Sequence, residues 1–377
     1  MGDDVKLKTL LNQHTMDSAP ELEVRLPAGQ RGELAVQCVA CGHRCRIPEG
    51  RAGVCRVRFN AGGRLRAPSG YVAGLQVDPI EKKPFFHAYP GRDALSFGML
   101  GCDYHCGYCQ NWVTSQALRD DKAVSLPRFC DAETLADLAV EQGAPVIVST
   151  YNEPLITADW AMAVFGAARD RGIVCGFVSN GNATPEVLEY IRPRVDLYKV
   201  DLKGFNDRNY RKLGGSLENV LATIRLLKTM DFWVEIVTLV VPGFNDGDEE
   251  LTRIAEFIAG VSVDIPWHAT AFHPDYRMTD PGRTPAETLV RAYEIGKSAG
   301  LHFVYPGNLP GEVDHREDTY CPDCGAGLIR RRGFLVLENR MTAGQCPSCH
   351  RRVPGVWEAS CPKASAGNGR PRPVNIG

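Results

Sequence analysis

Three cysteines lie close together in the stretch "GCDYHCGYCQN", residues 101–111. Cys102, Cys106 and Cys109 have the spacing C-x3-C-x2-C, and Tyr108 stands just before the last cysteine. Three thiolates on one short loop can hold three irons of a 4Fe–4S cluster, which leaves the fourth iron open to a ligand that is not protein. The spacing therefore predicts a catalytic cluster. A zinc knuckle with His105 as the fourth ligand is the alternative.

Two further cysteine groups flank this loop at a distance. The later group has paired C-P-x-C turns, which predict a zinc ribbon. The earlier group has the spacing C-x2-C-x3-C-x9-C, which fits a structural zinc, a second 4Fe–4S cluster, or a site where His43 replaces one cysteine. We favour zinc here, because so small a module, rich in Gly and Arg, needs a metal to fold. The earlier group is Cys38, Cys41, Cys45 and Cys55, and the later group is Cys321, Cys324, Cys346 and Cys349.

Short apolar runs alternate with helical patterns between residues 94 and 306, as in βα units that build a parallel sheet. Six or seven such units are fewer than the eight of a closed barrel. The expected fold class is therefore α/β, a partial, open TIM-like barrel of about six units with ligands at the carboxyl ends of its strands. Helix starts are predicted at Thr184–Pro185 and at a capping box from Thr284 to Glu287. The expected strands are 94–100, 144–150, 173–179, 195–200, 232–241, 268–272 and 302–305, and the expected helices include 132–142, 158–170, 216–230 and 249–260.

The cysteine groups and changes in composition divide the chain into four parts. An N-terminal cysteine-rich metal module and linker occupies residues 31–93, the barrel 94–310 and the zinc ribbon 311–363. Residues 364–377 contain Gly, Pro and Asn with almost nothing apolar, and are predicted to be a disordered tail. The charged run "DPIEKKP", with His87 after it, joins the first module to the barrel and is predicted to form a solvated turn.

Composition limits the classes of protein to consider. The chain has 377 residues, 44% of them hydrophobic, 23% charged, and a net charge of −2, which is ordinary for a globular protein. No apolar stretch fits a signal peptide or a membrane span, so we expect a cytoplasmic protein in which the 14 cysteines point to metal binding. Cys130, Cys175 and Cys361 stand outside the three groups and are not expected to be ligands. Both cysteine-rich flanks are locally basic, which raises the alternative of a metal-dependent RNA- or protein-binding scaffold. They lack interleaved aromatic residues, so nucleic acid is not expected.

The cysteine loop and several strand ends resemble the radical S-adenosylmethionine (SAM) enzymes. In that superfamily the open iron binds SAM, and an electron from the cluster splits it into methionine and a 5'-deoxyadenosyl radical. The segments "TYNEPL", "VSNGN", "KVDLKG" and "HATAFHPD" each follow a predicted strand. The resemblance implies that Glu153 holds the amino group of SAM and Asn180 its ribose, while Asp201 and Lys203 suit a zwitterionic ligand. The implied cofactor-binding residues are Tyr108, Asn152, Glu153, Asn180, Asp201, Lys203 and His273.

A closer resemblance covers residues 36 to 355. The segments "DPIEKKPFFHAYPG", "GCDYHCGYCQN", "YPGNLPG" and "TYCPDCG" resemble the radical enzyme of the AmmeMemoRadiSam system, a relative of pyruvate formate-lyase activating enzymes. This likeness implies a flavodoxin or ferredoxin-type electron donor and Memo-like and AMMECR-like partner proteins. It also implies hydrogen abstraction from an unknown substrate, with a glycyl residue of a partner protein as one candidate. The expected cofactors are a 4Fe–4S cluster, SAM and zinc.

Overall fold

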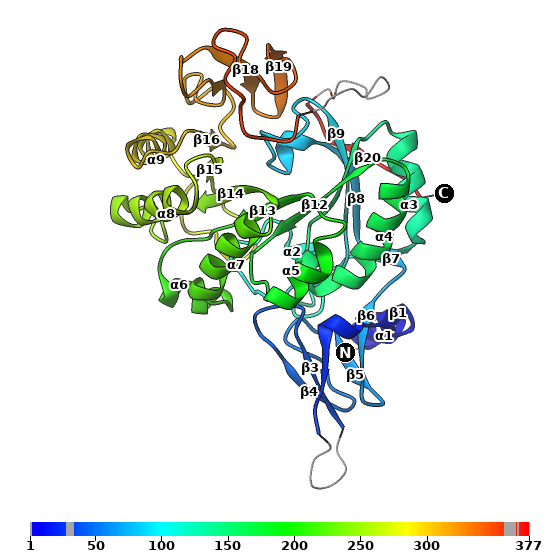
Figure 1. Cartoon of the computed structure of the whole chain (residues 1–377). Coiled ribbons are helices and arrows are strands. Elements are labelled where there is room, and N and C mark those ends of the chain that lie inside the picture. The colour runs from blue at the N-terminus through cyan, green and yellow to red at the C-terminus, as the bar shows by residue number, and fades with distance from the viewer. Residues whose placement is uncertain (1, 28–33, 358–366, 368, 377) are drawn as a thin grey trace.

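A nine-stranded sheet forms the centre of the computed structural model, which describes residues 2–27, 34–357, 367 and 369–376 (Figure 1). The strand order is β16-β15-β14-β13-β12-β11-β9-β8-β20, and neighbours from β9 to β16 are parallel. Strands β8 and β20 are antiparallel additions at one edge. The sheet has edges at β16 and β20, and its curvature into a partial barrel remains a prediction. The bounds are β8 (Gly74–Pro79), β9 (Asp93–Gly98), β11 (Val146–Ser149), β12 (Val174–Ser179), β13 (Leu197–Asp201), β14 (Trp233–Val240), β15 (Trp267–Ala271), β16 (Val304–Gly307) and β20 (Arg372–Pro373).

Helices follow the parallel strands in the expected order, and local capping explains several of their starts. Asp131, Thr184 and Ser216 each accept a hydrogen bond from a backbone N–H in the first turn of the next helix. The predicted capping box at Thr284 is wrong, because its hydroxyl bonds to the Phe272 N–H and the Val240 carbonyl. No helix in the described ranges is long and apolar enough to cross a membrane. The helices are α2 (Trp112–Ser115), α3 (Ala132–Glu141), α4 (Ala158–Asp170), α5 (Pro185–Ile191), α6 (Asp207–Leu213), α7 (Leu217–Thr229), α8 (Asp248–Val261) and α9 (Ala286–Ser298), with short turns η2 (Ile80–Lys82) and η3 (Pro154–Thr157).

A small N-terminal module lies at the bottom of Figure 1, built from short antiparallel strands. Two three-stranded sheets, β2-β3-β4 and β1-β6-β5, form most of it, and β7 pairs with β10 of the main body. Arg58, buried in this module, forms an ion pair with Asp159 of α4 and so fixes the module to the main body. The elements are α1 (Gly2–Gln13), β1 (Thr15–Asp17), η1 (Pro20–Leu22), β2 (Glu23–Arg25), β3 (Ala35–Cys38), β4 (Arg46–Pro48), β5 (Phe59–Ala61), β6 (Arg64–Pro68), β7 (Tyr71–Val72) and β10 (Arg128–Phe129).

The predicted ribbon region forms a three-stranded antiparallel sheet at the opposite end of the molecule, at the top of Figure 1. Its strands are β17 (Thr319–Tyr320), β18 (Gly327–Arg332) and β19 (Leu335–Asn339). Its apolar cluster also includes Phe86, Phe303 and Tyr305 of the main body. The ribbon therefore shares a core with the edge of the large sheet instead of enclosing one of its own.

Two expectations about the linker and the tail differ from the structure. The run "DPIEKKP" is not a solvated turn: Glu81 and His87 are fully buried and Lys83 is 4% exposed. The predicted disordered tail contains β20, which pairs with β8. Residues 31–33, 358–366, 368 and 377, which belong to the predicted module, ribbon and tail, lie outside the described residues. The domain limits themselves stay a prediction.

Candidate active site at the carboxyl ends of the strands

The loop that carries the three cysteines leaves the carboxyl end of β9. Gly101 allows the turn with a φ of +90°, a conformation that L side chains rarely adopt. The Tyr104 N–H donates to the Cys102 Sγ at 3.4 Å, and the Ser115 hydroxyl lies 3.2 Å from the Cys109 Sγ. Burial raises the pKa of all three thiols, that of Cys106 to about 12. Coordination to a metal would offset this, since a metal binds the thiolate form.

A cavity of about 360 Å³ adjoins the loop. Its lining comes from the cysteine loop, from the parallel strands β12 to β15, from the segment that follows β8, and from the ribbon hairpin. Such a position at the carboxyl ends of parallel strands is where α/β folds place their ligands. The lining side chains include Cys106, Tyr108, Cys109, Tyr151, Lys199, Asp201, Lys203, His268, Thr270, Lys82, Lys83, Phe86 and Phe334.

Three charged side chains of β13 and the residues just after it share one face of the cavity. Residues 199, 201 and 203 alternate along an extended segment, so their side chains point to the same side. Asp201 pairs with Lys199, and its other oxygen lies 3.4 Å from the Lys203 Nζ. Burial alone would raise the pKa of Asp201, but the two lysines outweigh it and lower that pKa. The centre therefore holds a carboxylate between two ammonium groups.

Glu153 lies behind the cysteine loop, in a buried network with Asp103. The Glu153 carboxylate accepts hydrogen bonds from the Ser179 hydroxyl and the Asn180 N–H at 2.7 Å, and from the Leu155 N–H at 3.1 Å. Burial, and then the nearby Asp103 carboxylate, raise the pKa of Glu153 to about 8. Asp103 in turn accepts from the side-chain amide of Asn180 at 2.7 Å. Glu153 and Asn180 are thus brought together, but neither lines the cavity.

The remaining predicted cofactor residues have different surroundings. Tyr108, Asp201 and Lys203 line the cavity. Asn152 fixes a turn, because its side chain accepts from the Met99 N–H at 3.0 Å and donates to the Glu153 carbonyl. The side chain of His273 is 58% exposed and does not line the cavity, but its Nδ1 lies 3.0 Å from the side-chain amide of Gln110, which does.

Several charged residues of the site were missed by the sequence analysis. The sequence contained a signal for Lys199, because "KVDLK" places charged residues two apart on a strand, where their side chains share one face. Asp103, next to Cys102, had none, because its partners Asn180 and Asn182 come from a distant part of the chain. Lys83 was assigned to a solvated turn, although it is buried in the cavity wall.

The four ribbon cysteines are drawn together more tightly than the other cysteine groups. Their Sγ atoms all lie within 4.8 Å of one another, the one such group of metal-binding side chains among the described residues. The Sγ atoms of Cys321 and Cys349 are 3.5 Å apart, and those of Cys324 and Cys346 are 3.6 Å apart. Four thiolates placed tetrahedrally about 2.3 Å from a zinc ion would be about 3.8 Å apart. The ribbon geometry therefore fits a tetrahedral thiolate site.

The N-terminal cysteines gather near the active-site loop. Cys38, Cys41 and Cys55 are buried and Cys45 is half-buried. Burial, followed for Cys41 by the nearby Asp103 carboxylate, raises the pKa of these thiols. The adjacent His43 Nε2 lies 3.8 Å from the same carboxylate. The module thus meets the cysteine loop through Asp103.

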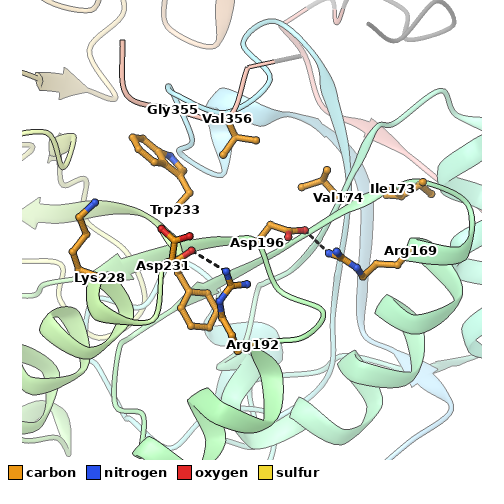
Figure 2. Close-up of a pocket in the computed structure, with 12 residues that line it drawn as sticks. Arg169, Ile173, Val174, Arg192, Asp196, Lys228, Asp231, Trp233, Gly355 and Val356 are labelled. Atoms are coloured by element: carbon orange, nitrogen blue, oxygen red, sulfur yellow. Dashed lines mark hydrogen bonds and ion pairs between the residues drawn. The ribbon is translucent and has the colours of Figure 1, made fainter. Parts of the chain in front are cut away.

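A second pocket, of about 540 Å³, lies at the amino ends of β12, β13 and β14 (Figure 2). Arg169 pairs with Asp196 at 2.7 Å across it, and Arg192 donates to the Asp231 carbonyl at 3.0 Å. Its lining contains no cysteine. The pocket lies at the end of the strands that in such folds serves stability, whereas the cavity at the loop lies at the carboxyl ends.

Comparisons with known proteins agree with the chemistry of the loop. The radical SAM superfamily matches residues 98–258. A protein of Methanocaldococcus jannaschii is 36% identical over 323 residues, which cover 84% of this chain and 95% of the relative. The pyruvate formate-lyase-activating enzyme of Streptococcus mutans is 29% identical over 181 residues, 45% of this chain and 66% of that enzyme. The enzyme of the same name from Staphylococcus aureus is 28% identical over 242 residues, which cover 59% of this chain and 93% of that enzyme.

Solved structures give a weaker match. The crystal structure of a radical SAM methyltransferase from Sphaerobacter thermophilus has a TM-score of 0.43 and 16% identity, over 78% of this chain and 80% of that one. The sequence matches and the cysteine loop identify the family. The chain belongs to the radical SAM superfamily and is a radical SAM enzyme related to the pyruvate formate-lyase activating enzymes.

Proposed function

We propose that this enzyme reductively cleaves SAM at a 4Fe–4S cluster held by Cys102, Cys106 and Cys109, and then abstracts a hydrogen atom from a substrate. The observation that carries the proposal is the position of Cys106 and Cys109 on the wall of the cavity. Superfamily membership implies both cofactors and favours this enzyme over a binding scaffold. When bound, the cluster supplies the electron that splits SAM into methionine and a 5'-deoxyadenosyl radical.

The charged residues beside the loop suit the methionine end of SAM. Lys203 offers an ammonium group for the carboxylate, and Asp201 a carboxylate for the amino group. Glu153 is a further ligand for that amino group: a carboxylate has about four lone-pair sites, and three are used by the hydrogen bonds described above. We assign Tyr108 to the cavity wall and Asn180 to the ribose, with Asn152 holding the turn. His273 would act only at the rim.

The other metal sites and partners extend this proposal. A zinc ion in the ribbon is supported by the tetrahedral spacing of its four thiols. The N-terminal cysteines are proposed to hold zinc, with a second cluster as the alternative. Related activating enzymes suggest a protein substrate and an electron donor, for which we propose a flavodoxin or ferredoxin-type protein. Memo-like and AMMECR-like partners, and a glycyl residue as the site of hydrogen abstraction, remain candidates.

Removal of one cluster cysteine tests the central claim. We expect Cys106→Ala to lose about four irons per chain, because two thiolates cannot hold a cluster whose fourth iron is already open. The variant should form no 5'-deoxyadenosine from SAM after reduction with dithionite, as measured by chromatography of the anaerobically reconstituted protein. Cys130→Ala, which removes a half-buried cysteine outside the three groups, is the control. Full iron and SAM cleavage in Cys106→Ala would overturn the assignment.

A further inference from the structure

A second charged centre lies in the same cavity, apart from the one on β13. Lys82 and Lys83, at the end of η2, both pair with Asp78 of β8, at 2.8 and 2.6 Å. The Tyr151 hydroxyl donates to the same carboxylate at 2.6 Å, and the Lys83 Nζ lies 3.4 Å from that hydroxyl. Asp78 is fully buried, whereas both lysines and Tyr151 line the cavity. The proposed cleavage of SAM does not use this centre.

The two centres share one composition and leave the same charge. Each consists of two lysines around one aspartate: Lys82 and Lys83 around Asp78, and Lys199 and Lys203 around Asp201. Each therefore leaves one positive charge without a matching carboxylate. A structural ion pair would need only one lysine for Asp78, so the second lysine is surplus to that role.

Other charged groups near the second centre are already engaged. Glu81 lines the cavity, but it accepts from the Gly91 N–H at 2.9 Å and lies 3.8 Å from the Arg331 guanidinium. His268 lies 2.7 Å from Glu235, which also accepts from two backbone N–H groups. The surplus charge on the lysines is thus left facing the cavity.

The environment of Lys83 indicates what would stabilise it. Burial, with a smaller contribution from repulsion by Lys82 and Lys199, lowers its pKa to about 8 against the attraction of Asp78. A positive charge in a poorly hydrated cavity is costly unless it is paired. Asp78 pairs with Lys83 but balances only one of the two lysines, so an anion bound between the two centres would balance the surplus positive charge.

We propose that Lys83 and Lys82 bind an anionic group of the substrate, a carboxylate or a phosphate. This assignment names the substrate class for the proposed function and rests on it, since Asp201 and Lys203 are given to SAM. Phe86 and Phe334 line the same cavity and provide apolar contact for the rest of the molecule. The substrate is then a small organic acid or phosphate ester, in place of the protein substrate that the related activating enzymes suggest. A glycine in a protein loop carries no charge for these lysines to bind.

Equilibrium dialysis of small labelled anions tests the site without turnover. The probes are acetate, inorganic phosphate and, as the uncharged control, acetamide. Each is dialysed against the anaerobically reconstituted full chain with saturating SAM and no reductant. We expect acetate or phosphate to bind at least tenfold more tightly than acetamide, because only an anion pairs with the lysines. The tighter of the two anions identifies the group on the substrate.

Matched variants locate the binding. Lys83→Gln should weaken binding of the preferred anion at least tenfold, and Lys82→Gln several-fold. Lys122→Gln, which removes an exposed lysine, should leave it unchanged. Lys82 is 31% exposed, so its variant keeps the test decisive if Lys83→Gln fails to fold. The proposal is overturned if acetate, phosphate and acetamide bind equally well. It is also overturned if the Lys82 and Lys83 variants both bind the anion as tightly as wild type does.

The outcome is separable from that of the proposed function. If SAM is not cleaved but the anion binds in a Lys83-dependent way, the function fails and the anion site stands. If SAM is cleaved and anion binding is unchanged in Lys83→Gln and Lys82→Gln, the proposed anion site is wrong and the proposed function is kept.

Discussion

At the scale of single residues, the buried carboxylates beside the cysteine loop are the most unusual feature of the site. Glu153 and Asp103 are both almost fully buried and interact with each other. Two carboxylates that approach in a buried place disfavour each other's charge, unless donors surround them. Here backbone and side-chain donors from the end of β12 supply those hydrogen bonds. A bound ammonium group would add the countercharge that these neutral donors lack.

We expect Glu153→Gln to weaken SAM binding about 10- to 100-fold while iron content stays unchanged. The amide removes the charge that favours an ammonium group, which is worth about 1.5–3 kcal/mol in a charge-assisted bond. Equilibrium binding of labelled SAM to the reconstituted protein measures the change. Glu186→Gln, at a half-exposed carboxylate paired with Arg44, is the control. Unchanged affinity would assign the amino group to Asp201 alone.

At the scale of elements, the segment after β8 connects the cavity to the ribbon through buried hydrogen bonds. The His87 Nδ1 lies 2.8 Å from the Pro354 carbonyl, which can only accept, so Nδ1 carries the proton. The other ring nitrogen then accepts from the Tyr305 hydroxyl at 2.7 Å. That hydroxyl contacts Thr319 at 2.8 Å, and Thr319 accepts from Arg331 of the ribbon. A neutral His87 satisfies every member of this chain.

Acid should therefore weaken the junction through His87. Burial lowers its pKa to about 4, whereas an unfolded histidine binds a proton below about pH 6.5. Between these values the unfolded state binds more protons, so the free energy of unfolding falls as the pH is lowered. When the pH is lowered from 7.5 to 5, we expect the free energy of unfolding of wild type to fall by about 2 kcal/mol more than that of His87→Gln. Urea unfolding at both pH values measures this difference.

The control for this comparison is His315→Gln, at a side chain that is 76% exposed. Its stability should change with pH as wild type does. If His87→Gln also follows wild type, the buried histidine is not what makes the junction sensitive to acid.

The elements also show what the sequence could and could not predict. Each predicted strand of the parallel series was an apolar run, and each is present, because a strand buried on both faces needs such a run. The prediction of a solvated turn at "DPIEKKP" was wrong because several of its partners are remote in sequence. Glu81 lies close to Arg331, and Lys83 lies close to the Tyr151 hydroxyl. A charged run has the same local pattern whether its partners are water or distant side chains. The spacing "KVDLK" had a local signal for the first charged centre. The second centre also lies mostly in one run, since Asp78, Lys82 and Lys83 all belong to "DPIEKKP", but nothing local showed that this run faces a cavity with Tyr151 and not solvent.

At the scale of the whole molecule, the ribbon and the cavity are coupled. Phe334 of the ribbon hairpin lines the cavity, and Arg331 donates to the Phe86 carbonyl at 2.8 Å. Phe303 and Tyr305, at the edge of the main sheet, belong to the apolar cluster of the ribbon. Loss of the ribbon would therefore open one wall of the cavity and leave the cysteine loop in place.

The variant Cys346→Ser/Cys349→Ser tests whether the ribbon is needed for the cavity wall but not for the cysteine loop. Metal binding supplies much of the folding free energy of so small a unit, so the ribbon should unfold. We expect the protein to lose one zinc per chain and to become sensitive to limited proteolysis between residues 311 and 357. Iron content and SAM cleavage without substrate should persist, whereas turnover of the true substrate is lost. If SAM cleavage disappears while iron is retained, the ribbon is part of the cofactor site.

The pairing of β20 with β8 has a consequence for the order of folding. From β8 to β16, each strand of the main sheet lies beside the one that follows it in the chain, with only β10 placed elsewhere, so these pairs can form as the chain lengthens. The outer edge of β8, at Gln76 and Val77, must wait for Arg372 and Pro373 of β20. Until then it presents unpaired N–H and C=O groups, the feature that invites strands of other molecules. That edge of β8 is therefore a place where a nascent chain of this protein is exposed to aggregation.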